Sequence, residues 1–361
     1  MPKRILFSRD DIIRYRLQNQ KISESKLDRA EDVVRWMGAV QAQDFAAAKW
    51  AVGGRTKAAT DALIEQAFAD GAILRTHIMR PTWHFVAPED IRWLLKLTAP
   101  RVNAASAYQY RRLELDSAVF KRSNRIIEKA LRDGKQLTRE ELGVALKKAG
   151  ISAIDLRLTY IVMRAELNGL ICSGARRGKQ FTYALLDERA PQTKALTREE
   201  ALAELTARYF RSHGPATLRD FVWWSGLTMA DAKTGLEMVK SQFTHESLDD
   251  QTYWFSDSKS VRRKISPAVY LLLNYDEYVV GYTDRSAIFD TANIEKLDSR
   301  GSPLMNTIII NGQIAGTWKR IIKPKMIEIE INLFVLPTKA EERALDDATE
   351  RYRKFANYKL R

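Results

Sequence analysis

The feature that most constrains the fold is an order of elements that repeats along the chain. It is clearest in the middle, where residues 136–142 open a helix and Thr138 and Glu141 have the spacing of a capping box. Residues 155–168 predict a second helix, because their apolar positions form one stripe. A hairpin with a basic tip follows and returns through residues 181–185. This order is typical of a winged helix, in which the second helix would be the recognition helix.

The same order recurs toward the C-terminus. Thr197 and Thr228 are placed to cap helices on either side of a short helix at about residues 216–225. A hairpin is predicted at residues 243–255, but its tip, residues 246–250, is acidic. An acidic tip favours packing against a neighbouring domain over contact with phosphate.

The N-terminal unit is more diverged. Helices are predicted from Ser8 to about Asn19, over residues 26–40 and over residues 60–70. A hairpin is predicted at residues 73–86, and Pro88 is placed to start another helix.

After about Ser266 the pattern becomes β-rich. Strands are predicted at residues 269–273, 277–280 and 326–334, and Asn311-Gly312 predicts a type I′ hairpin. A helix is expected from about Thr338. The expected fold is therefore α+β, with three tandem winged helix-turn-helix units and a small C-terminal β-rich domain with a terminal helix. The expected domains are residues 1–115, 116–192, 193–265 and 266–361.

Composition narrows the functional classes. The 361 residues with 45% hydrophobic content suffice for two or three cores, and no apolar run is long enough to cross a membrane. The N-terminus has no signal-peptide pattern, and Cys172 is the only cysteine, so we expect a cytoplasmic protein without disulfides. The 4 histidines lack zinc-ligand spacing, and no Gly-rich phosphate loop is present, so we expect no metal and no cofactor.

The charge balance points to a polyanion. The formal charge is +14, with 59 Lys and Arg against 45 Asp and Glu. Such a balance favours nucleic acid as partner, although any single basic cluster can also be a solvated face. Basic clusters occur within residues 111–135, at the second hairpin tip and after the third hairpin; the predicted DNA contacts among them are Arg176, Arg177, Lys179, Arg262, Arg263 and Lys264.

Two glutamines, Gln41 and Gln43, stand in an otherwise apolar stretch. Residues two apart point the same way only in an extended chain, so the preceding helix must end near Val40 if both amides serve one site. The alternative is a polar helix end. Asp44 is a second catalytic candidate, or the cap of the following helix.

Four segments, residues 37–44, 74–90, 273–285 and 311–320, resemble the winged-helix DNA glycosylases of the AlkZ and YcaQ type. The resemblance implies three winged helices in a curved arrangement, a C-terminal β domain and excision of alkylated bases from DNA. It also implies catalysis by a Gln-apolar-Gln motif, which Gln41-Ala42-Gln43 matches in its AlkZ-like form. Pro81 departs from the pattern, since a small residue is expected there.

The chemistry suits neutral amides. Alkylation at N7 of guanine or N3 of adenine makes the base cationic and a good leaving group. The enzyme then has to position a water at C1′ and stabilise an oxocarbenium-like sugar. An amide offers both donor and acceptor for such a water. We expect Gln41 and Gln43 to do this jointly, without a strong base.

The first hairpin carries further candidates. Its predicted DNA contacts are Arg75, His77, Arg80 and His84. Trp83 could stack on a base or belong to the core of the hairpin. In the C-terminal part, Asp276-Glu277 and Asp284-Arg285 could form an acid pair or an internal ion-pair network.

The expected function is excision of alkylated purines, including bulky or crosslinked adducts, from double-stranded DNA. A monomer without an obligate protein partner, located in the cytoplasm with the nucleoid, is expected. The alternative is a non-catalytic winged-helix regulator, although regulators usually dimerise to read two half-sites. An RNA-binding role is a weaker third possibility.

Overall fold

One order of elements recurs three times in the computed structural model, which describes residues 7–23, 26–193, 195–256, 267–290, 306–323 and 326–356. Each repeat has a helix, a short extended segment, two more helices and a hairpin. The elements of repeat 1 are α2 (Ala30–Met37), β1 (Val40–Gln41), α3 (Phe45–Gly53), α4 (Asp61–Ala69), β2 (Leu74–Met79) and β3 (Thr82–Val86).

Repeats 2 and 3 follow the same order. Repeat 2 consists of α6 (Ser117–Leu131), β4 (Leu137–Thr138), α7 (Arg139–Lys148), α8 (Asp155–Leu167), β5 (Ile171–Ser173) and β6 (Thr182–Leu185). Repeat 3 consists of α10 (Arg198–His213), the extended residue Ala216, α11 (Leu218–Ser225), α12 (Met229–Val239), η1 (Lys240–Gln242), β7 (Thr244–Leu248) and β8 (Gln251–Phe255). The predicted capping box of Thr138 and Glu141 is confirmed.

Strand pairing is also the same in each repeat. The first sheet has the order β1-β3-β2 and the second the order β4-β6-β5. In repeat 3, Ala216 forms a bridge with Trp254 on β8, which pairs with β7. The short extended segment therefore always lies beside the second strand of the hairpin and leads directly into a capped helix.

The C-terminal part is a four-stranded antiparallel sheet covered by a helix. The sheet has the order β12-β11-β10-β9. Its elements are β9 (Val269–Leu272), α13 (Glu277–Val280), β10 (Thr307–Ile310), β11 (Gln313–Lys323), β12 (Met326–Leu333) and α14 (Lys339–Phe355). Asn311 and Gly312 both have positive φ at the β10–β11 turn, as a type I′ hairpin requires.

Two predictions about local structure were wrong, and helices α3 and α6 were not predicted. Residues 277–280 are helical, because Asp276 caps α13 by accepting a hydrogen bond from the Tyr278 backbone amide. The helix predicted over residues 26–40 is shorter, since α2 ends at Met37, where Gly38 has φ +79° and lets the chain turn.

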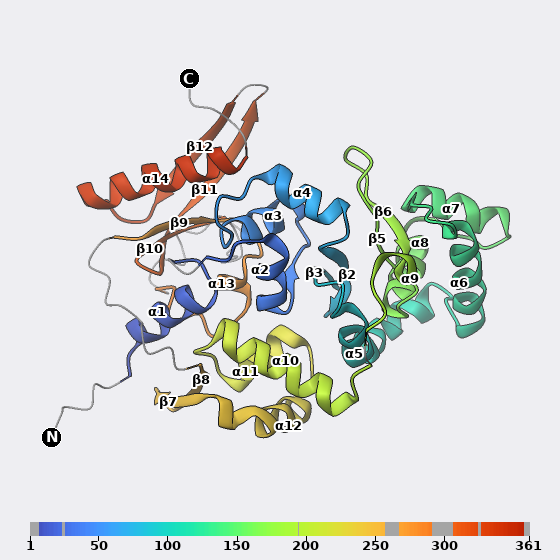
Figure 1. The fold of residues 1–361 in the computed structure, drawn as a ribbon, viewed down its shortest axis with the longest axis horizontal. Coiled ribbons are helices and arrows are strands. Elements are labelled where there is room, and N and C mark those ends of the chain that lie inside the picture. The colour runs from blue at the N-terminus through green and yellow to red at the C-terminus, as the bar shows by residue number, and fades with distance from the viewer. Residues whose placement is uncertain are drawn as a thin grey trace.

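The three repeats and the C-terminal sheet lie side by side in Figure 1, with repeat 2 at one end and the β9–β12 sheet at the other. The long helix α5 (Ile91–Arg112) and the short α9 (Leu186–Arg189) connect the repeats. Repeats 2 and 3 share one hydrophobic core with α5, through residues such as Leu94, Ile161 and Tyr209. Repeat 1 has its own core around Val33 and Phe85.

The apolar face of helix α1 (Arg9–Asn19) does not join the core of repeat 1, although the helix precedes that repeat in sequence. Its residues Ile12 and Ile13 share a core with Tyr253 of β8 and Tyr278 of α13. The predicted domain boundary at residue 115 thus groups α1 with elements that it does not join in this core.

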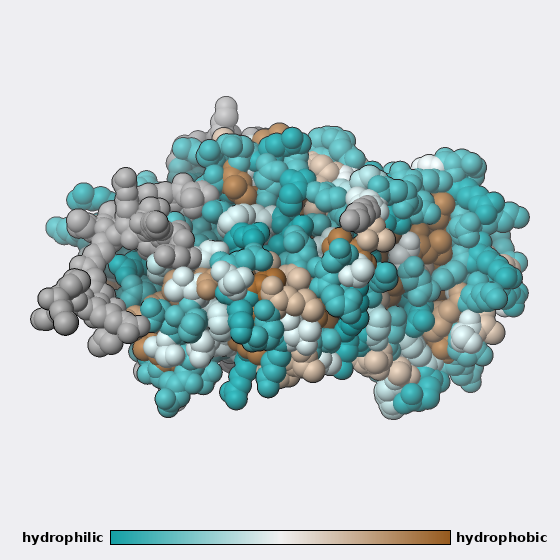
Figure 2. Space-filling model, turned by 60° about the horizontal axis from the view of Figure 1, so that its bottom comes forward, coloured by the Kyte–Doolittle hydropathy of each residue, from teal (hydrophilic) through white to brown (hydrophobic). Residues whose placement is uncertain are grey.

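The surface in Figure 2 is mostly hydrophilic, with separate hydrophobic patches on the face that is shown. Within the described part of the chain, no helix combines the length and apolar character that crossing a membrane would need.

One buried ion pair connects repeat 1 to the C-terminal part. Arg55, which follows α3, donates from both terminal nitrogens to Asp276, at 2.7 and 2.9 Å. Both side chains are at most 3% exposed. Arg55 also donates to the backbone and side-chain oxygens of Gln20, so the guanidinium is well satisfied.

Replacement of Asp276 by Asn should lower the free energy of unfolding by about 3–5 kcal/mol, because it leaves the buried Arg55 without its counter-ion. Urea denaturation would measure this loss. Asp28→Asn removes the partner of Lys57 in a solvent-exposed pair and should change stability little. Equal effects of the two substitutions would contradict the structural role of the Arg55–Asp276 pair.

Candidate active site at Gln41 and Gln43

Gln41 and Gln43 lie on the extended segment between α2 and α3. Gln41 pairs with His84 on β3, and the Ala42 amide donates to the Trp83 carbonyl at 2.7 Å. The helix ends before Val40, as one shared site requires. The two side chains differ in exposure: Gln41 is 8% exposed, whereas Gln43 is a surface residue.

Asp44 caps helix α3. Its Oδ1 accepts a hydrogen bond from the Ala47 amide at 3.0 Å. Thr138 and Thr217 cap the corresponding helices of repeats 2 and 3. Of the two readings of Asp44, the structure therefore favours the helix cap.

The three caps align the repeats. Counting back one residue from each cap, Leu137 and Ala216 stand at the position of Gln43. Repeat 1 thus carries an exposed amide where the other two repeats carry apolar residues. If a polar residue were simply required at this helix end, the other two repeats would carry one as well. The difference favours a functional site specific to repeat 1.

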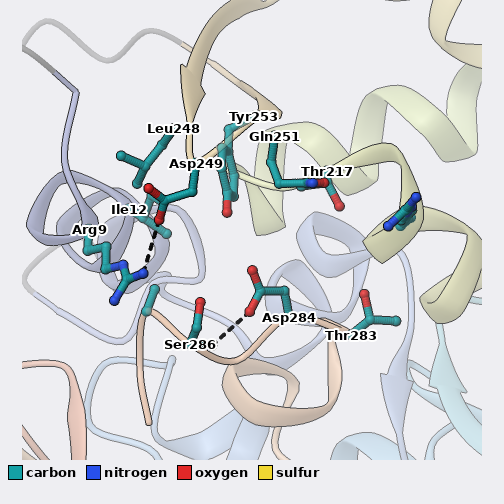
Figure 3. A pocket seen from close by; sticks show the side chains of 12 residues that line it. Arg9, Ile12, Thr217, Leu248, Asp249, Gln251, Tyr253, Thr283, Asp284 and Ser286 are labelled. Atoms are coloured by element: carbon teal, nitrogen blue, oxygen red, sulfur yellow. Dashed lines mark hydrogen bonds and ion pairs between the residues drawn. The ribbon is translucent and has the colours of Figure 1, made fainter. Parts of the chain in front are cut away.

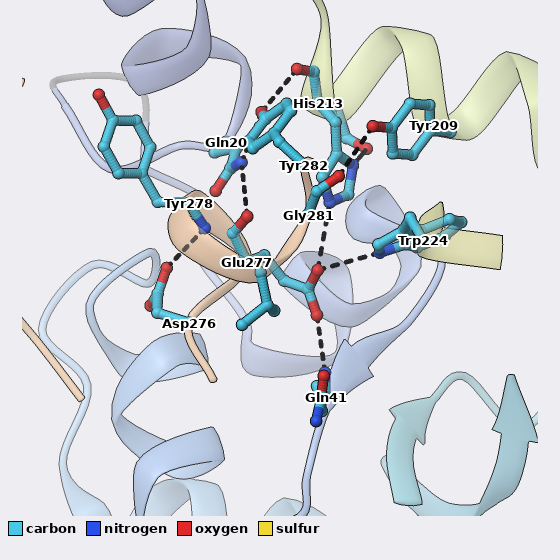
Figure 4. Close-up of polar contacts among 12 residues, drawn as sticks. Gln20, Gln41, Tyr209, His213, Trp224, Asp276, Glu277, Tyr278, Gly281 and Tyr282 are labelled. Atoms are coloured by element: carbon cyan, nitrogen blue, oxygen red, sulfur yellow. Dashed lines mark hydrogen bonds and ion pairs between the residues drawn. The ribbon is translucent and has the colours of Figure 1, made fainter. Parts of the chain in front are cut away.

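Glu277 lies next to the Gln41 backbone, as the dashed line in Figure 4 shows. Its Oε1 accepts a hydrogen bond from the Gln41 backbone N–H at 2.7 Å. Its Oε2 accepts from the Trp224 indole at 2.9 Å and lies 3.4 Å from His213 Nε2. The Glu277 side chain is 1% exposed, so the carboxylate is satisfied entirely by protein groups.

Glu277 is ionised at neutral pH. Burial alone would raise the pKa of its carboxyl, but the contacts with His213 and the hydrogen bond from the Gln41 amide outweigh burial and lower the pKa below its usual value. Burial lowers the pKa of His213 despite the neighbouring carboxylate. A fixed negative charge therefore lies one hydrogen bond from the Gln41 backbone.

Arg80 holds the Gln41 side chain. Arg80 lies at the tip of the β2–β3 hairpin with φ +54°, and its guanidinium donates to Gln41 Oε1 at 3.2 Å. The hairpin tip packs against the end of α11, where a Cβ on Gly226 would come within 3.3 Å of the Arg80 side chain. Repeat 3 thus positions the tip of the first hairpin.

Gln43 accepts a hydrogen bond from the Trp83 amide at 3.3 Å through its Oε1. Gln41 is fixed at its backbone and its side chain, while Gln43 lies beside it at the surface. Two neutral amides on one extended segment can hold a water between donor and acceptor groups.

Three of the residues predicted to contact DNA from the first hairpin are buried instead. The Arg75 guanidinium lies between the Trp83 and Phe181 rings, at 4.3 and 4.4 Å from their centroids, and donates to the Ala42 carbonyl. His77 Nδ1 is 2.6 Å from a carboxylate oxygen of Glu166.

His84 is fully buried. Burial, followed by the charge of Arg80, lowers its pKa to about 3. Arg75, His77 and His84 have little or no solvent-exposed surface, so a direct contact with DNA does not fit their placement. They pack beneath the segment that carries the two glutamines. Arg80 is half-buried and borders the surface.

The tip of the second hairpin is exposed at Arg177 and Lys179. Arg176 pairs with Glu65 of α4 at 3.1 Å, and Arg177 pairs with Glu141 of α7. The remaining predicted contacts, Arg262, Arg263 and Lys264, lie outside the described residues.

The sequence identified Asp276 and Glu277 as a possible acid pair, but the structure separates their roles. Asp276 faces Arg55, whereas Glu277 faces Gln41. Asp284 accepts from the Ser286 amide and Arg285 donates to the Val279 carbonyl. Trp224 and His213 were not predicted as site residues. They contact Glu277, and Glu277 lies in one of the segments that resemble the glycosylase family.

A cavity of about 460 Å³ lies elsewhere, between α1, the β7–β8 hairpin and residues 283–287 (Figure 3). Its lining includes neither glutamine, and two of its charged residues, Arg9 and Asp249, pair with each other at 3.0 Å. Among the described residues, no group of His, Cys, Asp or Glu is arranged to hold a metal ion.

Known proteins resemble this chain over nearly its full length. A family model described as DNA glycosylase AlkZ-like matches residues 34–355. The interstrand DNA cross-link repair glycosylase of Streptomyces sahachiroi is 23% identical over 349 residues, which cover 92% of this chain and 93% of that protein. The solved structure of Streptomyces sahachiroi DNA glycosylase AlkZ superposes with a TM-score of 0.81 at 19% identity, covering 98% of both chains, and this likeness shows a shared fold.

The buried His84 generates a pH-dependent stability. Its pKa is lowered in the folded protein, so the unfolded chain binds more protons below about pH 6.5, and stability is lost as pH falls from there toward about 3. His84→Asn should remove this pH dependence. In urea denaturation, the wild type should lose about 3 kcal/mol more free energy of unfolding than the variant when the pH is lowered from 8 to about 4.5. His245→Asn, at an exposed position, should leave the pH profile parallel to that of the wild type.

Proposed function

We propose that this protein, which belongs to the AlkZ-like family of DNA glycosylases, hydrolyses the N-glycosidic bond of cationic N7- and N3-alkylpurines in double-stranded DNA. The observation that carries the proposal is the Gln41–Gln43 segment: Gln41 is held at its backbone N–H by Glu277 and at its side-chain oxygen by Arg80, and Gln43 lies beside it at the surface. The cross-link repair named for the Streptomyces relative supports including bulky and crosslinked adducts among the substrates.

In this mechanism the water oxygen forms a bond to C1′ while the C1′–N bond breaks. The electron pair of that bond passes to the base and neutralises its charge, and the water proton goes to solvent. Gln41 and Gln43 position the water through their amide groups. No strong base is required, because alkylation has already made the base a good leaving group.

Glu277 acts as a positioning residue in the proposed mechanism. Its carboxylate accepts from the Gln41 backbone N–H, so it fixes the extended segment that carries both glutamines and contributes a negative charge close to the site. A fixed negative charge in a buried setting favours the positive charge that develops on the sugar. In the protein without DNA, the half-buried Arg80 holds the Gln41 side chain through its hydrogen bond to Oε1.

We further propose that the three repeats are tandem winged helices whose curved arrangement binds DNA as a monomer. The recurring order of helices, short strand and hairpin supports this interpretation. Phosphate contacts are proposed at the second hairpin tip and in the basic run after repeat 3; these residues are Arg176, Arg177, Lys179, Arg262, Arg263 and Lys264. A location in the cytoplasm with the nucleoid belongs to the same proposal.

Gln41→Ala and Gln43→Ala should each slow base release by about a hundredfold or more, since each removes a group that orients the water. The measurement is single-turnover release of N7-methylguanine from a duplex, read as alkali-labile strand cleavage. Gln66→Ala on α4, which removes an exposed amide that donates to Asp70, is the matched control and should not change the rate.

Base release that persists in the Gln41→Ala, Gln43→Ala double variant would refute the site assignment. Absence of release from every alkylated duplex, with tight binding to a single DNA sequence, would refute the glycosylase proposal and favour a regulator.

Binding to undamaged duplex should weaken steeply as salt rises, because phosphate contacts release counter-ions. Fluorescence anisotropy between about 50 and 200 mM salt would give the slope of log affinity against log salt. Lys179→Ala should reduce the magnitude of this slope by about one. Lys57→Ala, whose ammonium pairs with Asp28 in repeat 1, is the control. An affinity that does not change with salt would argue against DNA as the partner.

A further inference from the structure

Trp223 presents an exposed indole close to the glutamine pair. Its side chain is 42% exposed, whereas the adjacent Trp224 points inward and is fully buried. The Trp223 indole nitrogen donates to the Val280 carbonyl at 3.0 Å, and this hydrogen bond fixes one edge of the ring. A large aromatic surface is thus held rigidly at the surface, although burial would stabilise it better.

Arg80 connects this ring to Gln41. Its guanidinium lies 5.5 Å from the Trp223 ring centroid, within cation–π range, and donates to Gln41 Oε1. A planar, delocalised cation therefore stands over the indole and contacts the proposed catalytic amide. An N-alkylated purine is also a planar, delocalised cation.

Arg80 is held weakly for a half-buried cation. Its guanidinium donates to the neutral side-chain oxygen of Gln41, and its buried Nε has no hydrogen-bond partner within the described part of the chain. A DNA phosphate offers a guanidinium shorter and stronger hydrogen bonds than the 3.2 Å contact with Gln41. Bound DNA can therefore draw Arg80 away and free both the ring and the Gln41 oxygen.

We propose that Trp223 is the surface on which the alkylated base rests, and that it selects bases that carry a positive charge. In the free protein the Arg80 guanidinium occupies the place of that base. The inference rests on the proposed function, since it concerns how the same site recognises its substrate. An indole attracts a cation over its face but gains much less from a neutral ring of the same shape.

The test compares two lesions that differ in charge and not in outline. One duplex carries N7-methylguanine and the other carries 7-methyl-7-deazaguanine, both on 2′-fluoro sugars that resist hydrolysis. The ratio of the two dissociation constants measures selection for charge. Replacing Trp223 by Leu should reduce this ratio by about tenfold, and Trp223→Phe should reduce it less.

Two controls separate the ring from its surroundings. Trp36→Leu removes another indole that donates to a backbone carbonyl and faces a cation, Lys21, and it should leave the ratio unchanged. Arg80→Leu should weaken binding to both duplexes but retain the preference for the charged base, because Trp223 remains.

A ratio that is the same in wild type and Trp223→Leu would overturn the inference. So would loss of the preference in Arg80→Leu with Trp223 intact. Wild-type release of N7-methylguanine from an ordinary deoxyribose is measured alongside. Absence of that release would refute the proposed function itself, whereas release with an unchanged ratio would refute only the role of Trp223.

Discussion

The hydrogen bond from the Gln41 backbone N–H to the Glu277 carboxylate is the contact on which the rest of the site depends. Removing a carboxylate from water costs several kcal/mol unless donors replace the lost hydration. The donors come from distant segments: the Gln41 amide of repeat 1 and the Trp224 indole of repeat 3, with His213 beside them. Each of these segments has to be in place for the charge to be tolerated, so the network fixes the relative positions of repeat 1, repeat 3 and the C-terminal part.

Local patterns in the sequence were sufficient for elements with clear caps and amphipathic stripes, such as α7, α8 and α10. They were not sufficient for α3, whose residues are buried on nearly every side between the core of repeat 1 and α14. A helix buried all round has no apolar stripe, and the sequence then shows no helical period. Helix α13 was predicted wrongly for another reason: three apolar residues after Glu277 fit a strand as well as a helix turn, and the Asp276 cap decides between the two.

The candidate site was only partly predictable for a related reason. Gln41 and Gln43 attract notice because polar residues are unusual in an apolar stretch. Their partners Glu277 and Arg80 are separated from them by 236 and 39 positions, and no local pattern reports such distances. The same limit explains His77 and His84, which look like surface cations in an alternating strand but are buried. His77 faces Glu166 of repeat 2, whereas His84 lies near Arg80 and Glu277.

The docking of the first hairpin tip against α11 and the contact of Glu277 with Gln41 have a consequence for biosynthesis. The ribosome completes repeat 1 early, but Gly226 and Glu277 emerge only after most of the chain has been made. A nascent or truncated chain can therefore contain both glutamines and still lack the groups that orient them. With the proposed function, the site that cleaves the glycosidic bond is complete only after the polypeptide has been synthesised past residue 277 and has folded.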